Sequence, residues 1–165
     1  MVFRILCVCT GNICRSPTAE AVLRHKFAAA GLAQKVAIDS AGTHGYHVGD
    51  GPDPRSQAAG EERGYDFSGQ TARKLTVEDY DAFDLILAMD RGHLSIMEQQ
   101  KPGQSRAELI MMRAFSPPEH QDANQPLDVP DPYYGAAQGF EEVLDLIEAA
   151  ADGVVADVAS RLKTN

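Results

Sequence analysis

The amino-acid sequence predicts an α/β fold: a single-domain, three-layer sandwich with a central four-stranded parallel sheet and helices on both faces. Short apolar runs of strand length alternate with segments of helical periodicity, which is the pattern of a parallel sheet. The length of 165 residues is that of one domain with its own core. No internal repeat is visible, so we expect one domain over residues 1–165.

The first strand and the first helix are the most clearly marked elements. The apolar run Phe3–Val8 predicts a buried strand. A short loop follows over 9–15. Ser16 and Pro17 then predict a helix start, with serine as the N-cap and proline at the first helical position. Apolar residues at helical spacing continue as far as Gly31, the expected stop.

The rest of the chain continues the alternation of strands and helices. Residues 44–54 are rich in Gly, Pro, Asp and His and are expected to form a surface loop. The other predicted elements are strands at Val36–Ile38, Asp84–Met89 and, more weakly, Leu109–Phe115, helices at Ser56–Arg63, Gly92–Gln100 and Phe140–Leu162, and a proline-rich polar segment at 116–135.

Charge and hydropathy exclude several classes of protein. The formal net charge is −9 and the Lys and Arg residues are scattered, whereas a nucleic-acid binder carries a basic stripe. The longest apolar runs, such as Leu85–Met89, are too short to span a bilayer. The first residues lack the features of a secretory signal. We therefore expect a cytoplasmic protein that binds neither nucleic acid nor membrane; its oligomeric state is not indicated.

The three cysteines lie close together, at Cys7, Cys9 and Cys14. An odd, tightly spaced set is a poor disulfide framework, and no second ligand pair lies at the spacing of a zinc site. Reduced cysteines and no bound metal are the expectation. No role is assigned to the histidines that form no recognisable set of ligands or bases, His44, His47, His93 and His120.

The loop between the first strand and the first helix is suited to binding an anion. In open α/β sheets, ligands bind beyond the carboxyl ends of the strands. A loop that leads into a helix N-terminus can direct several backbone N–H groups at one anion, with help from the helix dipole. Gly11 and Asn12 are residue types that tolerate the positive φ of a tight turn.

Cys9 and Arg15 stand at the two ends of this loop. The N–H groups, the dipole and Arg15 would together stabilise a Cys9 thiolate, the reactive form of cysteine. Arg15 offers a planar fork that fits two phosphate oxygens, and Ser16 can donate a hydrogen bond to the sulfur. A lone cysteine at a strand end is more often a small buried apolar residue, the interpretation adopted for Cys7. The Walker and G-x-G-x-x-G patterns of nucleotide sites are absent.

The segment Cys9-Thr10-Gly11-Asn12-Ile13-Cys14-Arg15-Ser16-Pro17 resembles the signature loop of the low molecular weight protein tyrosine phosphatases. The resemblance extends over nearly the whole chain. It includes four further stretches typical of that family: Asp39–Thr43, Pro52–Arg55, Asp84–Asp90 and Asp131–Tyr134.

The resemblance assigns expected roles to particular residues. Asp131, in the setting Pro130-Asp131-Pro132, corresponds to the general acid, and a pocket for the phenyl ring is expected between Tyr46, Tyr133 and Tyr134. Phosphate is expected to be bound by Thr10, Gly11, Asn12, Ile13, Cys14, Arg15 and Ser16.

Two further expectations concern the support and the oxidation of this loop. Asn12 and Ser40 resemble the pair whose hydrogen bonds hold the family's loop in shape. Gln70 stands where many members have a histidine and is expected to support the loop: it could replace one hydrogen bond of that histidine but cannot carry charge. Cys14 is close enough in sequence to form a disulfide with Cys9 after oxidation.

The function implied is hydrolysis of phosphotyrosine in proteins by a two-step mechanism. Cys9 is the expected nucleophile, Arg15 the phosphate clamp and Asp131 the acid and then the base, with no cofactor. A protein-arginine phosphatase of the same fold is an alternative, although its known members carry Thr where this chain has Ile13. A non-catalytic phosphotyrosine-binding module is a second alternative. Such a module would be expected to have lost one of the catalytic residues, and all three are present. An arsenate reductase would need a cysteine pair after Cys14, which this chain lacks.

Overall fold

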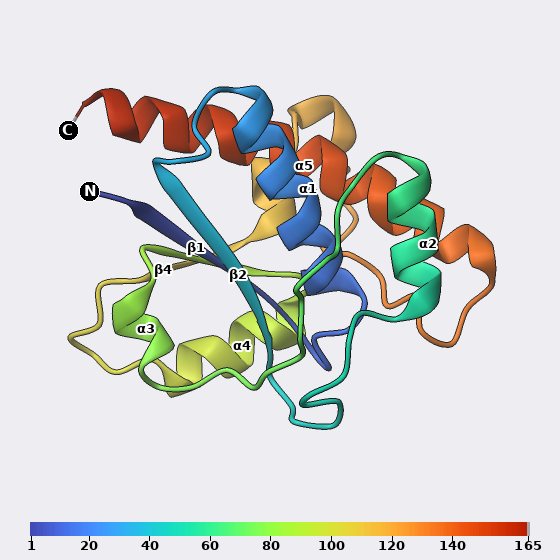
Figure 1. Ribbon diagram of the computed structural model, residues 1–165. Coiled ribbons are helices and arrows are strands. Elements are labelled where there is room, and N and C mark those ends of the chain that lie inside the picture. Colours follow the sequence, from blue (N-terminus) through green and yellow to red (C-terminus); the bar gives the residue numbers. More distant parts are fainter. Residues whose placement is uncertain (165) are drawn as a thin grey trace.

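A computed structural model of the protein describes residues 1–164, and it contains the predicted four-stranded parallel sheet (Figure 1). The strand order is β2-β1-β3-β4. The strands are β1 (Phe3–Cys9), β2 (Val36–Gly42), β3 (Leu85–Ala88) and β4 (Glu108–Met111). The chain passes from β1 to β2 on one side and then crosses to β3 on the other. This makes the carboxyl end of β1 the point where the strand order reverses, which is where open α/β sheets bind ligands.

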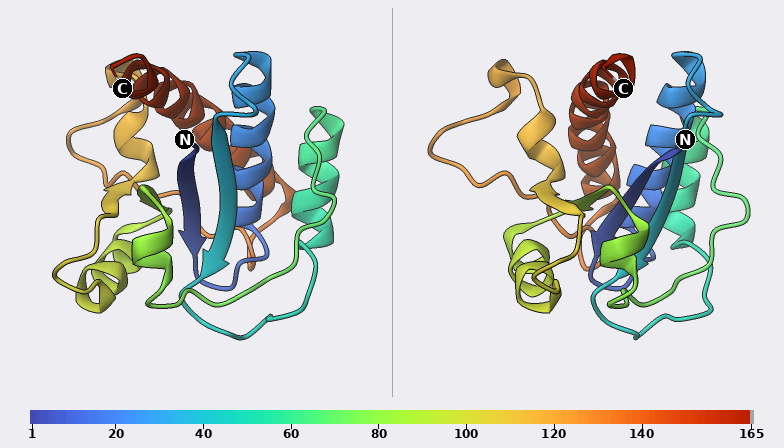
Figure 2. Two further views of the ribbon diagram at one scale, coloured as in Figure 1. Left: turned by 60° about the vertical axis from the view of Figure 1, so that its left-hand side comes forward. Right: turned by 90° about the vertical axis from the view of Figure 1, so that its left-hand side faces the viewer.

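Helices cover both faces of the sheet, as the sequence predicts (Figure 2). One face carries α1 (Arg15–Ala29), α2 (Pro54–Glu62) and α5 (Ala137–Lys163), and the other carries α3 (Asp79–Ala82) and α4 (Arg91–Gln100). Two short 3₁₀ helices, η1 (Met112–Phe115) and η2 (Pro118–His120), follow β4. Within residues 1–164 no helix has both the length and the apolar character needed to cross a bilayer.

Alternating side chains of the central strands build two separate apolar clusters. Ile5 and Cys7 of β1 pack with α1 and α5, whereas Leu6 and Val8 pack with α3 and α4. Both faces of the sheet are covered, so successive side chains of β1 are buried on opposite sides. This is why β1 reads as a continuous apolar run in the sequence. Cys7, with no exposed surface, belongs to the first cluster and is a buried apolar residue.

Three element boundaries differ from the prediction, each because of a side-chain or backbone pairing. β2 runs on to Gly42 because its last residues pair in register with β1, as far as Cys9 opposite Gly42. α2 begins at Pro54, two residues early, because the Asp53 side chain accepts a hydrogen bond from the Arg55 N–H and caps the helix. The predicted N-cap at Ser16 is wrong. α1 already begins at Arg15, and the Ser16 hydroxyl has other partners, described below.

The second half of the chain shows three further differences. The prediction of one strand at Leu109–Phe115 is wrong beyond Met111, where the chain turns into η1 against α5. The sequence analysis missed α3, a single helical turn, and α5 begins at Ala137, three residues before its predicted start.

The contact between α5 and η1 depends on a glycine. A Cβ atom added to Gly153 would lie 1.8 Å from the Phe115 carbonyl oxygen, a backbone atom that cannot move aside independently. Gly153→Ala should therefore lower the free energy of unfolding by about 1–3 kcal/mol, despite the better helix propensity of alanine. Urea denaturation measures this change.

The matched control is Gly139→Ala near the start of the same helix. The added Cβ would lie 3.6 Å from the Pro132 Cβ, an ordinary contact distance. This variant should be unchanged or more stable by up to about 1 kcal/mol. Equal effects of the two substitutions would contradict the packing argument.

Candidate active site

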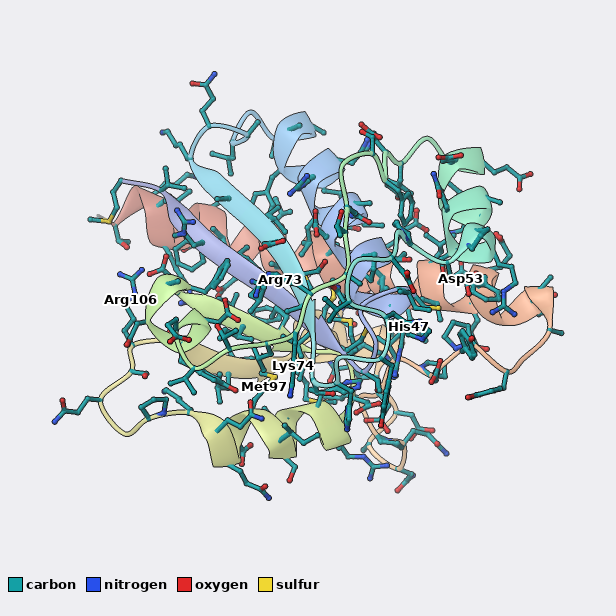
Figure 3. All side chains as sticks on the ribbon, turned by 60° about the horizontal axis from the view of Figure 1, so that its bottom comes forward. His47, Asp53, Arg73, Lys74, Met97 and Arg106 are labelled. Atoms are coloured by element: carbon teal, nitrogen blue, oxygen red, sulfur yellow. The ribbon has the colours of Figure 1, made fainter. Side chains whose placement is uncertain are left out.

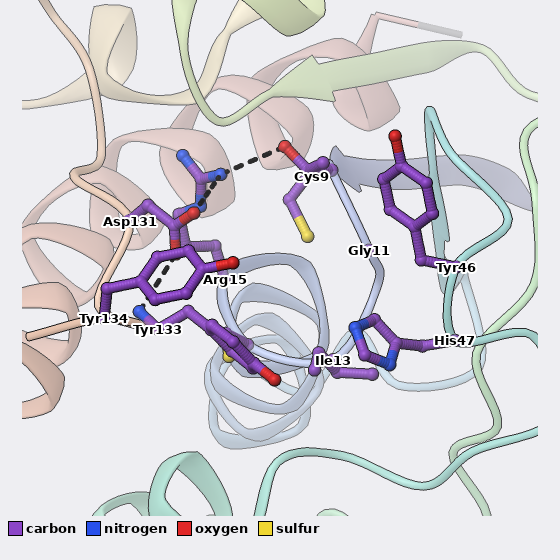
Figure 4. A pocket seen from close by; sticks show the side chains of 11 residues that line it. Cys9, Gly11, Ile13, Arg15, Tyr46, His47, Asp131, Tyr133 and Tyr134 are labelled. Atoms are coloured by element: carbon purple, nitrogen blue, oxygen red, sulfur yellow. Dashed lines mark hydrogen bonds and ion pairs between the residues drawn. The ribbon is translucent and has the colours of Figure 1, made fainter.

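A pocket of about 170 Å³ opens at the carboxyl end of β1 and the N-terminus of α1 (Figure 4). It brings together most of the residues that the sequence analysis selected, from three separate parts of the chain. The lining residues are Cys9, Thr10, Gly11, Ile13, Cys14, Arg15, Tyr46, His47, Asp131, Tyr133 and Tyr134.

The side chain of Asn12 holds the loop that forms the floor of this pocket. Within residues 1–164, Asn12 is the only non-glycine residue with positive φ, at 59°. Its Nδ2 donates to Ser16 Oγ at 2.8 Å and to Ser40 Oγ at 2.9 Å. Its Oδ1 accepts from the backbone N–H of Arg73, which lies beside β2 (Figure 3), at 3.0 Å. The predicted pairing of Asn12 with Ser40 is therefore present, within a larger network.

This network ends on a buried carboxyl group that the sequence analysis missed. Ser40 Oγ donates to Glu20 Oε1 at 2.7 Å, and Glu20 lies inside α1, 3% exposed. Burial raises the pKa of Glu20, and its contacts with Ser40 and Arg24 act in the opposite direction. An acidic residue on the apolar face of a predicted helix was the available sequence signal.

Gln70 lies between the start of the helix and the buried Glu20, whose pKa it helps to lower. Its Nε2 donates to the carbonyl oxygen of Pro17 at 3.0 Å, whereas its Oε1 is buried without a partner among the described residues. The expectation that Gln70 makes one hydrogen bond near the loop agrees with this contact. The bond reaches the first turn of α1.

Cys9 lies at the bottom of the pocket, with its sulfur beside the Ser16 hydroxyl. The residue is 2% exposed, and Cys9 Sγ lies 3.0 Å from Ser16 Oγ. Because Asn12 Nδ2 donates to Ser16 Oγ, the hydrogen of Ser16 is left for another acceptor. The Cys9 sulfur is closer than the alternative, the Ala41 carbonyl oxygen at 3.4 Å. Ser16 is thus placed to donate to a Cys9 thiolate.

The Arg15 guanidinium is buried and held from several sides. Nη1 donates to Asp90 Oδ2 at 2.8 Å and to the Val129 carbonyl oxygen at 3.0 Å, and Nη2 donates to Thr10 Oγ1 at 3.3 Å. Asp90, at the N-cap of α4, was not selected as a site residue from the sequence. Burial alone would raise the pKa of Asp90, but the His93 N–H and Arg15 outweigh burial and lower it. Asp90 therefore stays ionised beside Arg15.

His93 has a definite place in this arrangement, although the sequence analysis assigned it none. It lies in the first turn of α4, 3% exposed, with its Nε2 2.8 Å from Thr10 Oγ1. Its Nδ1 accepts from the Asp90 N–H at 3.1 Å, completing a capping box with Asp90. Burial lowers the pKa of His93 to about 4, so the ring is neutral at physiological pH. The sequence signal was a histidine three residues after the aspartate that follows a buried strand.

Asp131 stands at the mouth of the pocket, within reach of Arg15. Its Oδ2 lies 3.7 Å from Arg15 Nη2, and its side chain is 48% exposed. Its Oδ1 accepts from the Tyr133 N–H at 3.0 Å, an interaction that closes a tight turn between the two flanking prolines. The carboxyl group is thus oriented by the backbone of its own loop while remaining open to solvent.

Aromatic rings stand on opposite sides of the pocket mouth, as the sequence analysis expects (Figure 4). On one side, Tyr133 and Tyr134 meet edge to face with ring centroids 4.8 Å apart. On the opposite side, Tyr46 stacks on its neighbour His44, with ring centroids 5.1 Å apart. Tyr46 and Tyr134 are 74% and 91% exposed, so both rings are available to a ligand. His47, also unassigned from the sequence, packs so closely on the loop that a Cβ on Gly11 would lie 2.9 Å from its ring.

Cys14 lines the pocket but is almost fully buried, and its raised pKa makes it unlike a reactive thiol. It is 5% exposed, and burial raises its pKa to about 12. All three cysteines are free. Across residues 1–164, no three His, Cys, Asp or Glu side chains gather in an arrangement that could hold a metal ion.

The comparisons with known proteins agree on one family. The model of the low molecular weight phosphotyrosine protein phosphatase family matches residues 4–164. The chain is 43% identical over 164 residues to a low molecular weight protein-tyrosine-phosphatase of Streptomyces coelicolor, covering 99% of this chain and 98% of that protein.

Solved structures of phosphatases have the same fold as this chain. A protein tyrosine phosphatase from Entamoeba histolytica superposes with a TM-score of 0.87 at 35% identity, covering 96% of this chain and 97% of that one. A Drosophila arginine phosphatase superposes with a TM-score of 0.84 at 26% identity, covering 93% and 96%.

The Asn12 network makes a measurable contribution to stability. Asn12→Ala removes three side-chain hydrogen bonds and places a Cβ-bearing residue without local partners at positive φ. It should lower the free energy of unfolding by about 2–4 kcal/mol. Asn12→Gly loses the same bonds but tolerates the backbone conformation, and should recover about 1 kcal/mol. Urea denaturation of both variants separates the two contributions.

The control is Asn124→Ala in an exposed loop, which should change stability by less than about 0.5 kcal/mol. If Asn12→Gly is no more stable than Asn12→Ala, the backbone part of the argument fails.

Proposed function

The chain belongs to the low molecular weight phosphotyrosine protein phosphatase family, and from this premise we propose that it hydrolyses phosphotyrosine in proteins through a cysteinyl-phosphate intermediate. The nucleophile is Cys9, the phosphate clamp is Arg15 and the general acid and base is Asp131. The observation that carries the proposal is that the Cys9 sulfur, the Arg15 fork and the Asp131 carboxyl group line one pocket.

The first step transfers the phosphoryl group to sulfur. The Cys9 thiolate attacks phosphorus in line, forming the P–S bond as the bond to the tyrosyl oxygen breaks. Arg15 and the N–H groups of the loop, at the N-terminus of α1, stabilise the charge on the three equatorial oxygens. Asp131 at the pocket mouth donates its proton to the departing phenolate. The dephosphorylated tyrosine then leaves.

The second step returns the enzyme to its starting state. Asp131, now a carboxylate, accepts a proton from water, whose oxygen attacks phosphorus and displaces the Cys9 sulfur. Ser16, 3.0 Å from that sulfur, donates a hydrogen bond to the thiolate as it forms. Inorganic phosphate leaves with the oxygen of water. All of these groups belong to the chain itself, so the mechanism requires no cofactor.

The pocket walls favour an aryl substrate. Ile13 contributes an apolar side chain to the pocket lining, and Tyr46, Tyr133 and Tyr134 provide flat rings against which a phenyl ring can stack. The partners are therefore proteins that carry phosphotyrosine. Phosphoarginine is the second candidate substrate, because the Drosophila arginine phosphatase has the same fold. A charged guanidinium gains less than a phenyl ring from contact with Ile13.

A paired hydrolysis assay tests the nucleophile, the acid and the substrate class. With phosphotyrosine peptides, Cys9→Ser should abolish turnover and Asp131→Asn should lower kcat by about 10²- to 10⁴-fold. The exposed loop variant Asp122→Asn is the matched control and should retain wild-type activity. Activity is compared on phosphotyrosine and phosphoarginine peptides.

Each outcome of this assay is informative. Faster turnover of phosphoarginine would contradict the interpretation of Ile13 and the tyrosines. Binding of phosphotyrosine peptide by the wild type without turnover of either substrate would indicate a binding module.

Cys14 is proposed to protect the nucleophile during oxidation. Peroxide converts the Cys9 thiolate to a sulfenic acid. The Cys14 thiolate then attacks that sulfur, forming a disulfide and releasing hydroxide. Because burial raises the pKa of Cys14 to about 12, little thiolate is present at neutral pH, and the disulfide should form faster as the pH rises toward that value.

The protection is measured as the activity that dithiothreitol restores after peroxide treatment. Cys14→Ser should recover much less activity than wild type, because its sulfenic acid proceeds to irreversible oxidation states. Cys7→Ala, which removes the other non-catalytic cysteine, should recover like the wild type. Equal recovery of Cys14→Ser and wild type would disprove the protective role.

A further inference from the structure

The hydroxyl group of Thr10 is held by two side chains from different parts of the fold. Thr10 directly follows the nucleophile in sequence and lines the pocket. Its Oγ1 lies 2.8 Å from Nε2 of His93, a residue of α4 on the other side of the sheet from α1. Arg15 Nη2 donates to the same oxygen at 3.3 Å.

The surroundings of His93 determine which of its nitrogens carries the proton. Nδ1 accepts a hydrogen bond from the Asp90 N–H at 3.1 Å. Asp90 Oδ1 lies at the same distance from Nδ1, but it accepts its hydrogen bond from the His93 backbone N–H, so we assign the proton of the neutral ring to Nε2. Burial keeps the ring neutral above about pH 4 and outweighs the attraction of the nearby carboxylates of Asp90 and Asp131; Arg15 and His44 also oppose a charged ring. His93 Nε2 therefore donates to Thr10 Oγ1.

A count of donors and acceptors then fixes the direction of the Thr10 hydrogen. A hydroxyl oxygen accepts two hydrogen bonds and donates one. The two acceptor positions of Thr10 Oγ1 are taken by N–H groups of His93 and Arg15. Its own hydrogen has no acceptor among the hydrogen bonds of the described residues, and Thr10 is one of the residues that line the pocket.

We propose that His93 is a positioning residue: it orients the Thr10 hydroxyl so that its hydrogen is donated to an oxygen of the bound phosphoryl group. The inference rests on the proposed function and adds a side-chain donor to the backbone N–H groups and Arg15. A donor that is already oriented before the substrate arrives needs no reorganisation as charge develops on phosphorus-bound oxygen.

Helix capping does not account for this contact. The capping box uses only the His93 backbone N–H and Nδ1, and a Glu or Gln at this position would complete it equally well. Nε2 is not needed for the cap and reaches 83 positions back along the chain to Thr10. The same turn also supplies Asp90 to Arg15 Nη1. One turn at the start of α4 thus positions both nitrogens of the guanidinium fork, Nη1 directly and Nη2 through Thr10.

The test measures the affinity of the full-length protein for inorganic phosphate by calorimetry, together with kcat and KM on a phosphotyrosine peptide. Thr10→Val keeps the shape of the side chain and removes the hydroxyl. It should weaken phosphate binding by about tenfold or more, the effect of one hydrogen bond to a charged group. His93→Leu should weaken binding to a similar extent, and His93→Gln, which restores a donor, should recover most of the affinity.

The decisive measurement is the double variant. If His93 acts through Thr10, adding His93→Leu to Thr10→Val should cause little further loss of phosphate affinity. Multiplying effects would mean that His93 acts independently as a helix cap, and wild-type affinity of Thr10→Val would show that the hydroxyl does not contact phosphate. Either result overturns the inference.

The control is Thr43→Val, which removes the hydroxyl of a second Thr–His pair, Thr43 with His44, that lies outside the pocket lining. It should change phosphate affinity by less than about twofold. Urea denaturation of each variant identifies any loss of the fold. Phosphate affinity is measured without turnover, so a failure of the proposed hydrolysis and a failure of this inference give different results.

Discussion

The rest of the site depends on the backbone conformation of Asn12, which has a positive φ of 59°. In this conformation the loop turns tightly between β1 and α1, and the cost of the turn is offset by three hydrogen bonds from one side chain. These bonds join the loop to the first turn of α1, to β2 and to the backbone at Arg73. Because Ser16 accepts one of them, its own hydrogen is free for the Cys9 sulfur. The hydrogen bonds that support the loop and the contact of Ser16 with the sulfur of the proposed nucleophile therefore belong to one network.

The charged side chains around this loop differ in their burial and in their distance from Arg15. The chain carries a formal net charge of −9, yet the proposed function requires its pocket to receive a dianion. The local positive charge comes from Arg15, which is nearly fully buried and therefore needs an ionised partner. Asp90 is that partner, at 2.8 Å, and it approaches the fork from the side of α4. Asp131 lies farther from the fork, at 3.7 Å, and is more exposed, which leaves it able to exchange protons with substrate and water.

The fold class, with its four parallel strands covered by helices on both faces, and the family were predictable from sequence, and both predictions are confirmed. The strand Phe3–Val8 and the loop after it could be recognised because their signals are local: an apolar run followed by residue types suited to a tight turn. The errors arose where a side chain has a competing partner. Ser16 looked like an N-cap, but its hydroxyl is engaged by Asn12 and Cys9. Residues after Met111 looked like strand, but packing against α5 and Gly153 turns them into a 3₁₀ helix.

The sequence by itself determined which residues form the loop of the proposed anion site, because Cys9 to Ser16 are consecutive and one short loop brings them together. The tertiary structure alone decided what holds them. Ser40 is 28 positions from Asn12, Asp90 is 75 from Arg15, His93 is 83 from Thr10 and Val129 is 114 from Arg15. Contacts over such separations depend on the strand order β2-β1-β3-β4, which places the ends of β2 and β3 on either side of β1. A hydrogen bond within a loop follows from local residue types, whereas a bond between loops exists only once packing of the sheet has fixed their relative positions.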